Sequence, residues 1–589
     1  MRLIFALVLS ALLGTASVAQ ADGERGSGPP DFGPNVLIFD PSMPTSQIQE
    51  TVDAIHAQQV DAEFGDGRFA FLFKPGTYGT PTAPLNIPVG YYTSVAGLGA
   101  SPDDVTINGT INVLNRCPPV GDCNALTNFW RSVDNVHVIV PNGETEFWAT
   151  SQAAPLRRVH MTGNLFLFDY HSANPFSSGG FIADSLSDGG VIINGSQQQF
   201  ITRNSQIGLW TNGVWNQVFS GVIGAPPQSF GSTPFNPPPF TTLPTSPVTR
   251  EKPYLQVDSS GRYSVFVPAV QHDSSGTTWS KGPTPGTAIP IQRFFIASPG
   301  NSVQQINDAL QDGKNLILTP GIYHLRQAIR VQRPDTVVLG LGLPTLIPDD
   351  GSAAMTVDDG RGVDIAGVLF QAGPVNSRAL LELRGDHSDK VSALHDVFFR
   401  IGGAAAGRAT NSLVVNSDNV ILDDIWAWRA DHGTGVGWTD NRADTGVVVN
   451  GDNVIAYGLF VEHYQKYEVI WRGENGRTIM FQNEMPYDPP DQASWSHDAT
   501  LGWASFKVDD SVRHFEGWGL GSYCFFRVNP SIQASHALEV PVRTGVTLHD
   551  LLTVSLGGVG VIDHVVNDFG AAAQGAATIP VNVISYPPA

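Results

Sequence analysis

The chain has 589 residues, among them 62 glycines and 42 prolines, and only 15% of its residues are charged. Its 42% of hydrophobic residues can fill apolar cores, which excludes a charged disordered chain, and its length exceeds what one core normally serves. The net charge of −21 argues against nucleic acid and anionic membranes as partners and disfavours a polyanionic substrate, whereas a neutral glucan meets no such repulsion.

The first 21 residues are typical of a signal peptide. Arg2 precedes an apolar run from Leu3 to Gly14, and Ala19-Gln20-Ala21 offers a small-x-small cleavage pattern before Asp22. The run is too short to span a membrane, and no later stretch approaches twenty uninterrupted apolar residues. A buried first helix is the alternative. We expect a secreted, soluble, extracellular protein that begins near Asp22.

Three features occur twice, in the same order and at nearly the same spacing. The pairs are an amphipathic segment (47–55 and 302–310), a strand with a Pro-Gly-x-Tyr turn (73–78 and 318–323) and a Gly-Leu-Gly (97–99 and 340–342). A repeat over this distance predicts two copies of one architecture, each opened by a short capping helix.

Within each copy, short β-branched strands alternate with polar or glycine turns. In the second copy 413–428 aligns with 447–462, which puts Asp418 and Asp452 in register. Stacked strands without intervening helices predict an all-β chain of two parallel β-helices, although an immunoglobulin-like sandwich is a competing interpretation. We expect an N-terminal β-helix over 22–225, a Pro/Ser/Thr-rich linker with short strands over 226–295, and a C-terminal β-helix over 296–589.

Cysteine and histidine usage gives no indication of a cofactor. Cys117 and Cys123 lie close together in a loop-like stretch, and in an exported protein a disulfide is favoured over two free thiols. Cys524, among aromatic residues, is expected to be a buried apolar side chain. The histidines lack zinc-ligand spacing, so we expect no metal and no cofactor. Three acidic pairs are possible calcium ligands, although such pairs are more often turn residues (Asp349-Asp350, Asp358-Asp359 and Asp423-Asp424).

Segment 461–490 holds the densest group of chemically useful side chains. The spacing of Glu462 and Glu484 is close to one turn of a compact β-helix, so the two carboxyl groups can lie on neighbouring coils. Glycosidases need a pair of carboxyl groups, or one acid with an activated water. The aromatic residues around them are expected to be exposed, where sugar rings could stack on them (Trp426, Trp428, Trp471 and Tyr487). A solvated glutamate on the outer face of a solenoid is the alternative.

These segments resemble glycoside hydrolase family 55, a family of β-1,3-glucanases. The resemblance depends on FQNEMPYDPP (481–490) and VEHYQKYEVIWRG (461–473), with support from SQQQFITRNS (196–205), REKPYL (250–255) and the paired turns. It covers most of the mature chain. It implies tandem right-handed β-helices like those of pectate lyases, and an inverting hydrolase without a metal.

The resemblance also implies roles for individual residues. Glu484 matches the general acid, and Glu462 matches a second acidic position that polarises the attacking water or tunes Glu484. Trp428, Asp431 and Tyr487 match sugar-binding positions near the non-reducing end of the glucan.

A run of amides in the first copy is a further candidate. Gln197, Gln198 and Gln199 precede Ser205, and on a strand Gln197 and Gln199 share one face. One of these amides, or the Ser205 hydroxyl, can hold the attacking water in a groove between the copies. A ladder of amides inside a solenoid turn explains the run equally well.

The leading hypothesis is a secreted exo-β-1,3-glucanase that acts on laminarin-type glucan as a monomer. A polysaccharide lyase is a second hypothesis, against which the acidic charge and the lack of a basic cluster count. A non-catalytic carbohydrate-binding solenoid is a third, because a fold alone does not set function.

Overall fold

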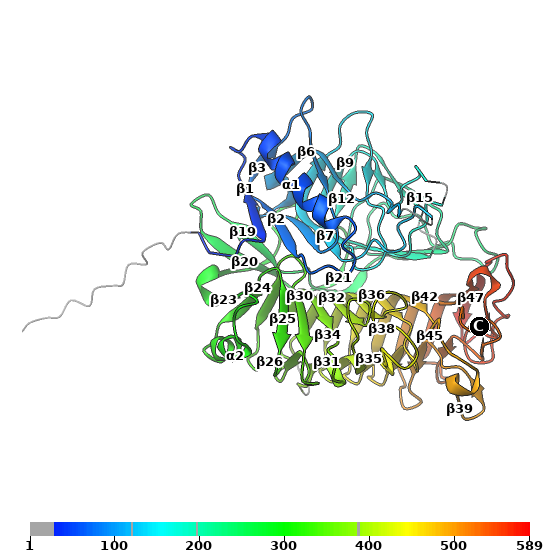
Figure 1. Cartoon of the computed structure of the whole chain (residues 1–589). Coiled ribbons are helices and arrows are strands. Elements are labelled where there is room, and N and C mark those ends of the chain that lie inside the picture. The colour runs from blue at the N-terminus through cyan, green and yellow to red at the C-terminus, as the bar shows by residue number, and fades with distance from the viewer. Residues whose placement is uncertain (1–28, 119–121, 173, 196–197, 386–388, 589) are drawn as a thin grey trace, which may run out of the picture.

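The computed structural model describes residues 29–118, 122–172, 174–195, 198–385 and 389–588. Two parallel β-helices lie side by side, the first blue to cyan and the second green to red in Figure 1. The predicted all-β tandem fold is therefore confirmed. The predicted signal peptide lies outside the described residues. None of the helices in the described ranges is long and apolar enough to cross a membrane.

The first β-helix is built from two parallel sheets. The larger has the order β1-β2-β5-β7-β9-β11-β14-β16-β17, and the smaller has the order β15-β13-β10-β8. Its strands are β1 (Val36–Phe39), β2 (Phe69–Phe73), β3 (Gly76–Tyr78), β4 (Leu85–Pro88), β5 (Thr93–Gly97), β6 (Val105–Asn112), β7 (Arg131–Ile139), β8 (Glu146–Phe147), β9 (Leu156–Thr162), β10 (Leu165–Phe166), β11 (Phe181–Ala183), β12 (Leu186–Asp188), β13 (Val191–Asn194), β14 (Gln199–Arg203), β15 (Leu209–Asn212), β16 (Asn216–Ser220) and β17 (Phe240–Leu243).

The second β-helix repeats the plan with longer strands. One sheet has the order β23-β24-β27-β30-β32-β34-β36-β38-β42-β45-β47, and the other has the order β26-β29-β31-β33-β35-β37-β41-β44. Its strands are β23 (Phe294–Ala297), β24 (Asn315–Leu318), β25 (Ile322–Leu325), β26 (Ile329–Val331), β27 (Val337–Gly340), β28 (Thr345–Pro348), β29 (Met355–Val357), β30 (Asp364–Gln371), β31 (Ser377–Leu383), β32 (Ser392–Ile401), β33 (Ala409–Val415), β34 (Val420–Arg429), β35 (Thr445–Val449), β36 (Ile455–Glu462), β37 (Val469–Trp471), β38 (Gly476–Glu484), β39 (Ser496–His497), β40 (Thr500–Leu501), β41 (Phe506–Val508), β42 (Phe515–Cys524), β43 (Gln533–Ala534), β44 (Leu538–Glu539), β45 (Val546–Ser555), β46 (Val561–Ile562) and β47 (Val581–Tyr586).

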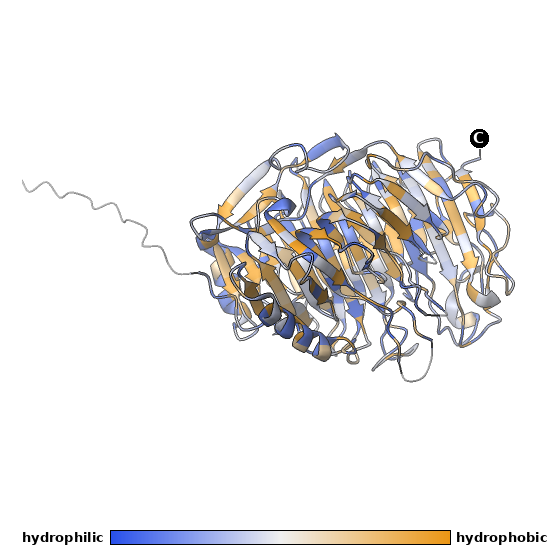
Figure 2. Cartoon of the chain, turned by 90° about the horizontal axis from the view of Figure 1, so that it is seen from above, coloured by the Kyte–Doolittle hydropathy of each residue, from blue (hydrophilic) through white to orange (hydrophobic). Residues whose placement is uncertain are grey.

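Each stack has a continuous apolar column inside it, because the strands pair in register. One row of the second column is Val397, Ile425, Leu459, Phe481 and Leu520, all buried and each the register neighbour of the next. Figure 2 shows the apolar and polar residues that alternate along many of these strands. A coil buries little apolar surface alone, so stacking supplies the core.

Both predicted capping helices are present. Helix α1 (Thr45–Gln59) buries Ile48, Val52 and Ile55, and helix α2 (Val303–Gln311) buries Val303, Ile306 and Leu310. In each case the apolar residues recur at three- or four-residue spacing and join the core of their own β-helix. The helices therefore cover apolar residues that the first coils would otherwise expose.

The linker is more ordered than its composition predicted. Strand β17 adds to the first stack beyond residue 225, so that stack ends at Leu243. The rest forms small antiparallel sheets from β18 (Ser246–Thr249), β19 (Tyr254–Val257), β20 (Tyr263–Pro268), β21 (Gln271–Ser274) and β22 (Gly286–Pro290).

Long strands of the second β-helix bend at one residue with positive φ. Most of these residues are glycine or aspartate, the types that adopt this conformation at low cost, and Met480 is an exception (Gly367, Asp396, Asp424, Gly458, Met480, Gly519 and Asp550). At Gly458 a Cβ atom would lie 2.7 Å from the Phe181 ring of the first β-helix. The bends thus face the first β-helix and permit its close approach.

A seam of buried charges joins the two β-helices. Arg157 pairs with Asp396 and Asp423 at 2.7 Å each, and Arg203 pairs with Asp423 at 3.0 Å and with Glu251 of the linker at 2.7 Å. These five side chains are at most 4% exposed. Burial opposes the ionisation of Asp423, but the charges of Arg203 and Arg157 hold its pKa well below the usual range.

The linker motif at 250–252 completes this seam. Arg250 pairs with Asp364 at 3.1 Å, and Lys252 lies 2.9 Å from Asp396 and 3.1 Å from Asp134. Both interpretations of Asp423-Asp424, a calcium ligand or a turn, are therefore wrong: the pair lies within β34, buried against the first β-helix. Asp350 and Asp359 accept backbone hydrogen bonds in turns, as the commoner interpretation predicted.

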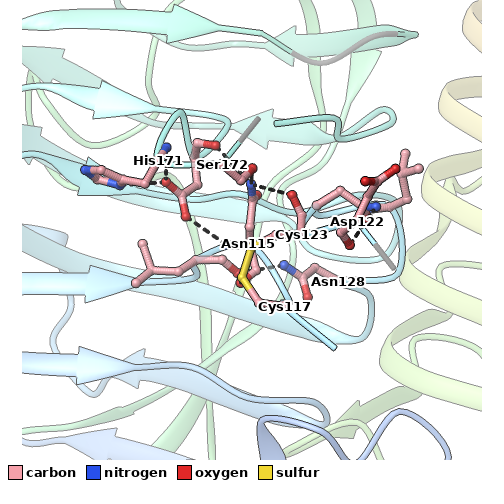
Figure 3. The surroundings of a disulfide bond; sticks show 11 residues. Asn115, Cys117, Asp122, Cys123, Asn128, His171 and Ser172 are labelled. Atoms are coloured by element: carbon pink, nitrogen blue, oxygen red, sulfur yellow. Dashed lines mark hydrogen bonds and ion pairs between the residues drawn. A yellow bond between two sulfur atoms is a disulfide. The ribbon is translucent and has the colours of Figure 1, made fainter. Parts of the chain in front are cut away.

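Cys117 and Cys123 form the predicted disulfide (Figure 3). Next to it, Asn115 donates hydrogen bonds to the Asp169 carbonyl oxygen at 3.0 Å and to the Ser172 hydroxyl at 2.7 Å, which ties the disulfide loop to 169–172. Cys524 is a buried free thiol in the second core, as predicted.

The seam predicts a large loss of stability when one cation is removed. In Arg203→Met the buried carboxylate of Glu251 loses its ion-pair partner and Asp423 loses one of its two arginines, which costs about 3–5 kcal/mol of unfolding free energy. Urea and thermal unfolding measure this loss. The exposed pair of Arg262 and Asp258 supplies the control, since Arg262→Met should change little. Equal effects of the two substitutions would contradict a stabilising role of the seam.

Candidate active site

Five side chains form a column along successive strands of the second β-helix. Register pairs Arg400 with Trp428, Trp428 with Glu462, and Glu484 with Tyr523. Phe460 pairs with Gln482 two residues earlier on the same strands, so Glu462 and Glu484 are also neighbours. Adjacent strands lie about 4.8 Å apart, so the two carboxyl groups lie close together on one face. The predicted placement on neighbouring coils is confirmed.

Glu462 is the inner member of the pair. It is 4% exposed, and both carboxyl oxygens accept hydrogen bonds, from the Trp426 indole at 2.8 Å and from the Gln152 amide at 2.9 Å. Burial raises the pKa of Glu462 well above its usual range, and the charge of Glu484 adds to the shift. Glu462 therefore favours the protonated form and has almost no contact with solvent.

Glu484 is the outer member. Its side chain is 13% exposed, and its two oxygens accept hydrogen bonds from the Gln198 amide and the Tyr487 hydroxyl. Burial and the neighbouring Glu484 charge raise the pKa of Tyr487, which keeps the phenol protonated and able to donate. The His463 ring nitrogen Nε2 lies 3.9 Å from Glu484. Glu484 is thus held by hydrogen bonds and remains reachable from solvent.

The first β-helix contributes a polar chain, of which the sequence analysis named Gln198 but not Gln152, Ser151 and Ser178. The Ser178 hydroxyl lies 3.4 Å from the side-chain amide oxygen of Gln152 and 3.2 Å from the Ser151 hydroxyl, and the Gln152 side-chain NH₂ donates to Glu462. The side-chain amide oxygen of Gln198 is buried and has no hydrogen-bond partner within the described ranges. These groups adjoin the glutamate pair, and an unpaired buried oxygen of this kind is a ready site for a water molecule.

The other candidates from the first β-helix do not reach the pair as predicted. Ser205 is buried, and its hydroxyl donates to the Arg203 carbonyl oxygen within the first β-helix. Gln199 donates to the Gly519 carbonyl oxygen and accepts from the Tyr523 hydroxyl at the boundary between the β-helices. Gln197 lies outside the described residues. Among the described amides of this run, Gln198 contacts Glu484.

The tryptophans near the pair are not exposed. Trp426 and Trp428 are at most 1% exposed, because aromatic rings of the first β-helix cover them (Phe64, Phe129 and Trp130). Trp471 points into the core of the second β-helix and is not part of the site. Tyr487 is half-buried. The prediction of an exposed aromatic surface is therefore wrong, and an aromatic wall between the β-helices takes its place.

Asp431 and His432 connect this wall to the glutamate pair. The His432 ring lies 2.8 Å from Asp431 and 2.6 Å from Glu63, and Glu63 pairs with Arg116 at 2.8 Å. Burial disfavours the imidazolium, but hydrogen bonds to Asp431 and Glu63 raise the pKa of His432 to about 10. Burial also opposes ionisation of Asp431, yet the hydrogen bond from His432 and the charge of His463 lower its pKa. Asp431 is therefore held as a carboxylate beside the site.

The chain has extensive similarity to known proteins. The LAM55 pectate lyase-like domain matches residues 294–484. An exo-beta-1,3-glucanase from Streptomyces sp. (strain SirexAA-E / ActE) is 51% identical over 579 residues, which cover 97% of this chain and 92% of that protein.

Two solved structures of sacteLam55A from Streptomyces sp. SirexAA-E also match. The first is 50% identical with a TM-score of 0.89, and covers 95% of this chain and 100% of that chain. The second is a variant with one glutamate replaced by alanine, in complex with glucose. It is 49% identical with a TM-score of 0.89, and covers 95% of this chain and 99% of that one.

The raised pKa of His432 predicts a pH-dependent contribution to stability. Its pKa in the folded chain is about 10, against an ordinary value of 6.5, so its contribution is full below pH 6.5 and is lost as pH rises through about 10. The melting temperature of the wild-type chain should therefore exceed that of His432→Gln most near pH 6, and the gap should narrow toward pH 10. The control is His324→Gln, whose ion pair with Asp349 is exposed and should show no such trend.

Proposed function

Since the chain belongs to glycoside hydrolase family 55, we propose that it is an exo-β-1,3-glucanase in which Glu484 is the general acid. The observation that carries this assignment is the pair of neighbouring glutamates with opposite environments, one sealed and one reachable. An acid that protonates a glycosidic oxygen must contact substrate, which Glu484 can do and Glu462 cannot.

We assign Glu462 an indirect role. Two carboxyl groups on adjacent strands are close enough for a retaining mechanism, in which the second carboxylate attacks the sugar. However, both Glu462 oxygens are engaged by Trp426 and Gln152, and the residue is buried. Glu462 therefore acts on water through Gln152 rather than on the anomeric carbon. This arrangement supports inversion.

The attacking water is assigned to the polar chain of the first β-helix. The Gln152 amide, the Ser178 hydroxyl and the free Gln198 oxygen supply donors and acceptors beside the glutamate pair. As the glycosidic bond breaks, Glu484 gives its proton to the leaving oxygen. The water adds to the opposite face of the sugar, its proton leaves to solvent water, and Glu484 takes up a new proton from solvent.

The aromatic wall supports cleavage from the chain end. Trp428 stands next to Glu462 in the column and is stacked against Phe64, while Asp431 and His432 lie alongside. We infer that this wall blocks the glucan beyond the sugar that is released, so that a terminal sugar is accommodated there. The Asp431 carboxylate can accept hydrogen bonds from hydroxyl groups of that sugar, and we place Tyr487 beside the same sugar.

We further propose that the enzyme is secreted and monomeric. The leader at 1–21 and the disulfide between Cys117 and Cys123 favour an oxidising compartment. The two β-helices of one chain already cover each other through the charged seam. Size-exclusion chromatography with light scattering tests the monomer, and N-terminal sequencing of the exported protein tests cleavage before Asp22.

Removal of the acid should abolish turnover without loss of the fold. Glu484→Gln should lower kcat on laminarin by about 10²–10⁴-fold, because the leaving sugar oxygen then departs unprotonated. An aryl β-glucoside with a good leaving group needs no acid, so its hydrolysis should be affected much less. Glu516→Gln, at a partly exposed ion pair with Arg477, is the matched control and should stay active. Full activity of Glu484→Gln on laminarin would contradict the assignment.

The anomer of the first product tests the mechanism. NMR of a fresh laminarin digest should show α-glucose before mutarotation, with no early ladder of oligosaccharides. Early β-glucose would instead make Glu462 a nucleophile in a retaining reaction. A ladder would indicate internal cleavage, an unsaturated product would indicate a lyase, and binding without products would indicate a non-catalytic solenoid.

A further inference from the structure

A cluster of histidines and aspartates lies on the first β-helix, away from the glutamate pair. His137 on β7 and His160 on β9 are register neighbours on adjacent coils, and their rings stack with centroids 3.9 Å apart. Asp103, from the short helix η1 (Pro102–Asp104), and Asp188, at the end of β12, flank them. Both histidines follow the positive-φ residues of their strands, Asn135 and Arg158. Gln152, Ser178 and Gln198 instead lie ahead of β9, β11 and β14.

One carboxylate oxygen faces both rings from the same side. Asp103 Oδ1 lies 2.6 Å from Nδ1 of His160 and 3.6 Å from Nδ1 of His137. The three ligand atoms lie within 4.8 Å of one another. Ligand atoms of a tetrahedral zinc ion lie about 3.3 Å apart, given bonds of about 2.0–2.1 Å, and the two measured separations bracket this value.

The far sides of both rings are already held by hydrogen-bonding partners. Nε2 of His160 lies 3.3 Å from Asp188, and Nε2 of His137 lies 3.0 Å from the Thr162 hydroxyl. The Thr162 hydroxyl donates a hydrogen bond to Asp188 at 2.8 Å, so its oxygen accepts the hydrogen bond from the N–H of His137 Nε2. In neutral His137 the lone pair is therefore on Nδ1 and points toward Asp103.

This arrangement leaves an electrostatic gap that a cation would fill. A lone pair on His137 Nδ1 and a carboxylate oxygen face each other across 3.6 Å, and nothing attractive joins them without a positive charge between. A metal ion removes the conflict, and the outer hydrogen bonds to Asp188 and Thr162 are those that metal-binding histidines commonly make.

We propose that Asp103, His137 and His160 bind one transition-metal ion, Zn²⁺ or Cu²⁺, at the surface of the first β-helix. Two imidazoles and a carboxylate suit these ions, whereas Ca²⁺ and Mg²⁺ prefer oxygen ligands alone. Asp103 is half-exposed, so an ion can enter, and the site would link η1 to two successive coils. Its role is to brace the first β-helix, independently of the glucanase reaction.

Zinc binding to the full mature chain, freed of any purification tag and of metal, tests the site by isothermal titration calorimetry. The wild-type chain should bind one Zn²⁺ and melt at a higher temperature with the ion present. His137→Ala, His160→Ala and Asp103→Asn should abolish this saturable binding, and Asp188→Asn should weaken it by about 10–100-fold. His324→Ala, which removes a histidine beside a carboxylate elsewhere on the surface, should bind as the wild type does.

Copper supplies a readout that does not depend on stability. The Cu²⁺ electron paramagnetic resonance spectrum should show coupling to two nitrogen atoms in the wild-type chain, and this two-nitrogen signal should be absent in His160→Ala. Absence of saturable binding, or equal binding by the wild type and both histidine variants, would overturn the proposal. Laminarin hydrolysis should be the same in His137→Ala and the wild type, since the cluster lies outside the catalytic site.

Discussion

The structure depends on the way in which two β-helices share buried charge. Arg157 and Arg203 of the first β-helix enter a region whose carboxylates, Asp396 and Asp423, come from the second. Buried ions are costly to desolvate, and this cost is offset only when every partner is in place. The seam therefore stabilises one relative placement of the two halves and penalises shifted ones. The linker adds Glu251 and Lys252 to the same seam, so the connection between the halves is also part of their interface.

The candidate active site exists only because of that placement. Glu462 and Glu484 belong to the second β-helix, but the amides that contact them, Gln152 and Gln198, belong to the first. Within the second β-helix, parallel register alone brings the two glutamates together. Contact with the first β-helix then gives the two glutamates different solvent exposure, because it buries Glu462 and leaves Glu484 reachable from solvent. The same fold thus supplies both the pairing of the carboxyl groups and the asymmetry that acid catalysis requires.

The positive-φ residues Asn135 and Arg158, within β7 and β9, separate two edges of the first β-helix. Residues that precede the bends meet the second β-helix and supply the polar chain at the glutamate pair. Residues that follow them, among them His137 and His160, face another edge. When the same kind of side chain occurs at the same position of successive coils, stacking in register places the two side chains next to each other. This one rule produces the carboxyl pair in the second β-helix and the imidazole pair in the first.

The sequence by itself determined the elements that depend on local pattern. The doubled helix-turn-strand order predicted two stacks, apolar spacing predicted the capping helices, and the interval between Glu462 and Glu484 predicted neighbours on adjacent coils. The disulfide followed from two cysteines close in the chain. These features depend on contacts within a coil or between successive coils, for which distance along the chain is informative.

Only the tertiary structure decided how the halves meet. Trp426 and Trp428 are buried because rings far away in the sequence cover them, and no local pattern carries that information. Likewise, Gln152 reaches Glu462 across the boundary, and Ser205 turns inward to a backbone carbonyl oxygen. Strand alternation predicted that Gln197 and Gln199 share one face, whereas among the described amides of this run it is Gln198 that contacts Glu484. Side-chain contacts between two solenoids depend on their relative rotation and offset, which the buried charges set.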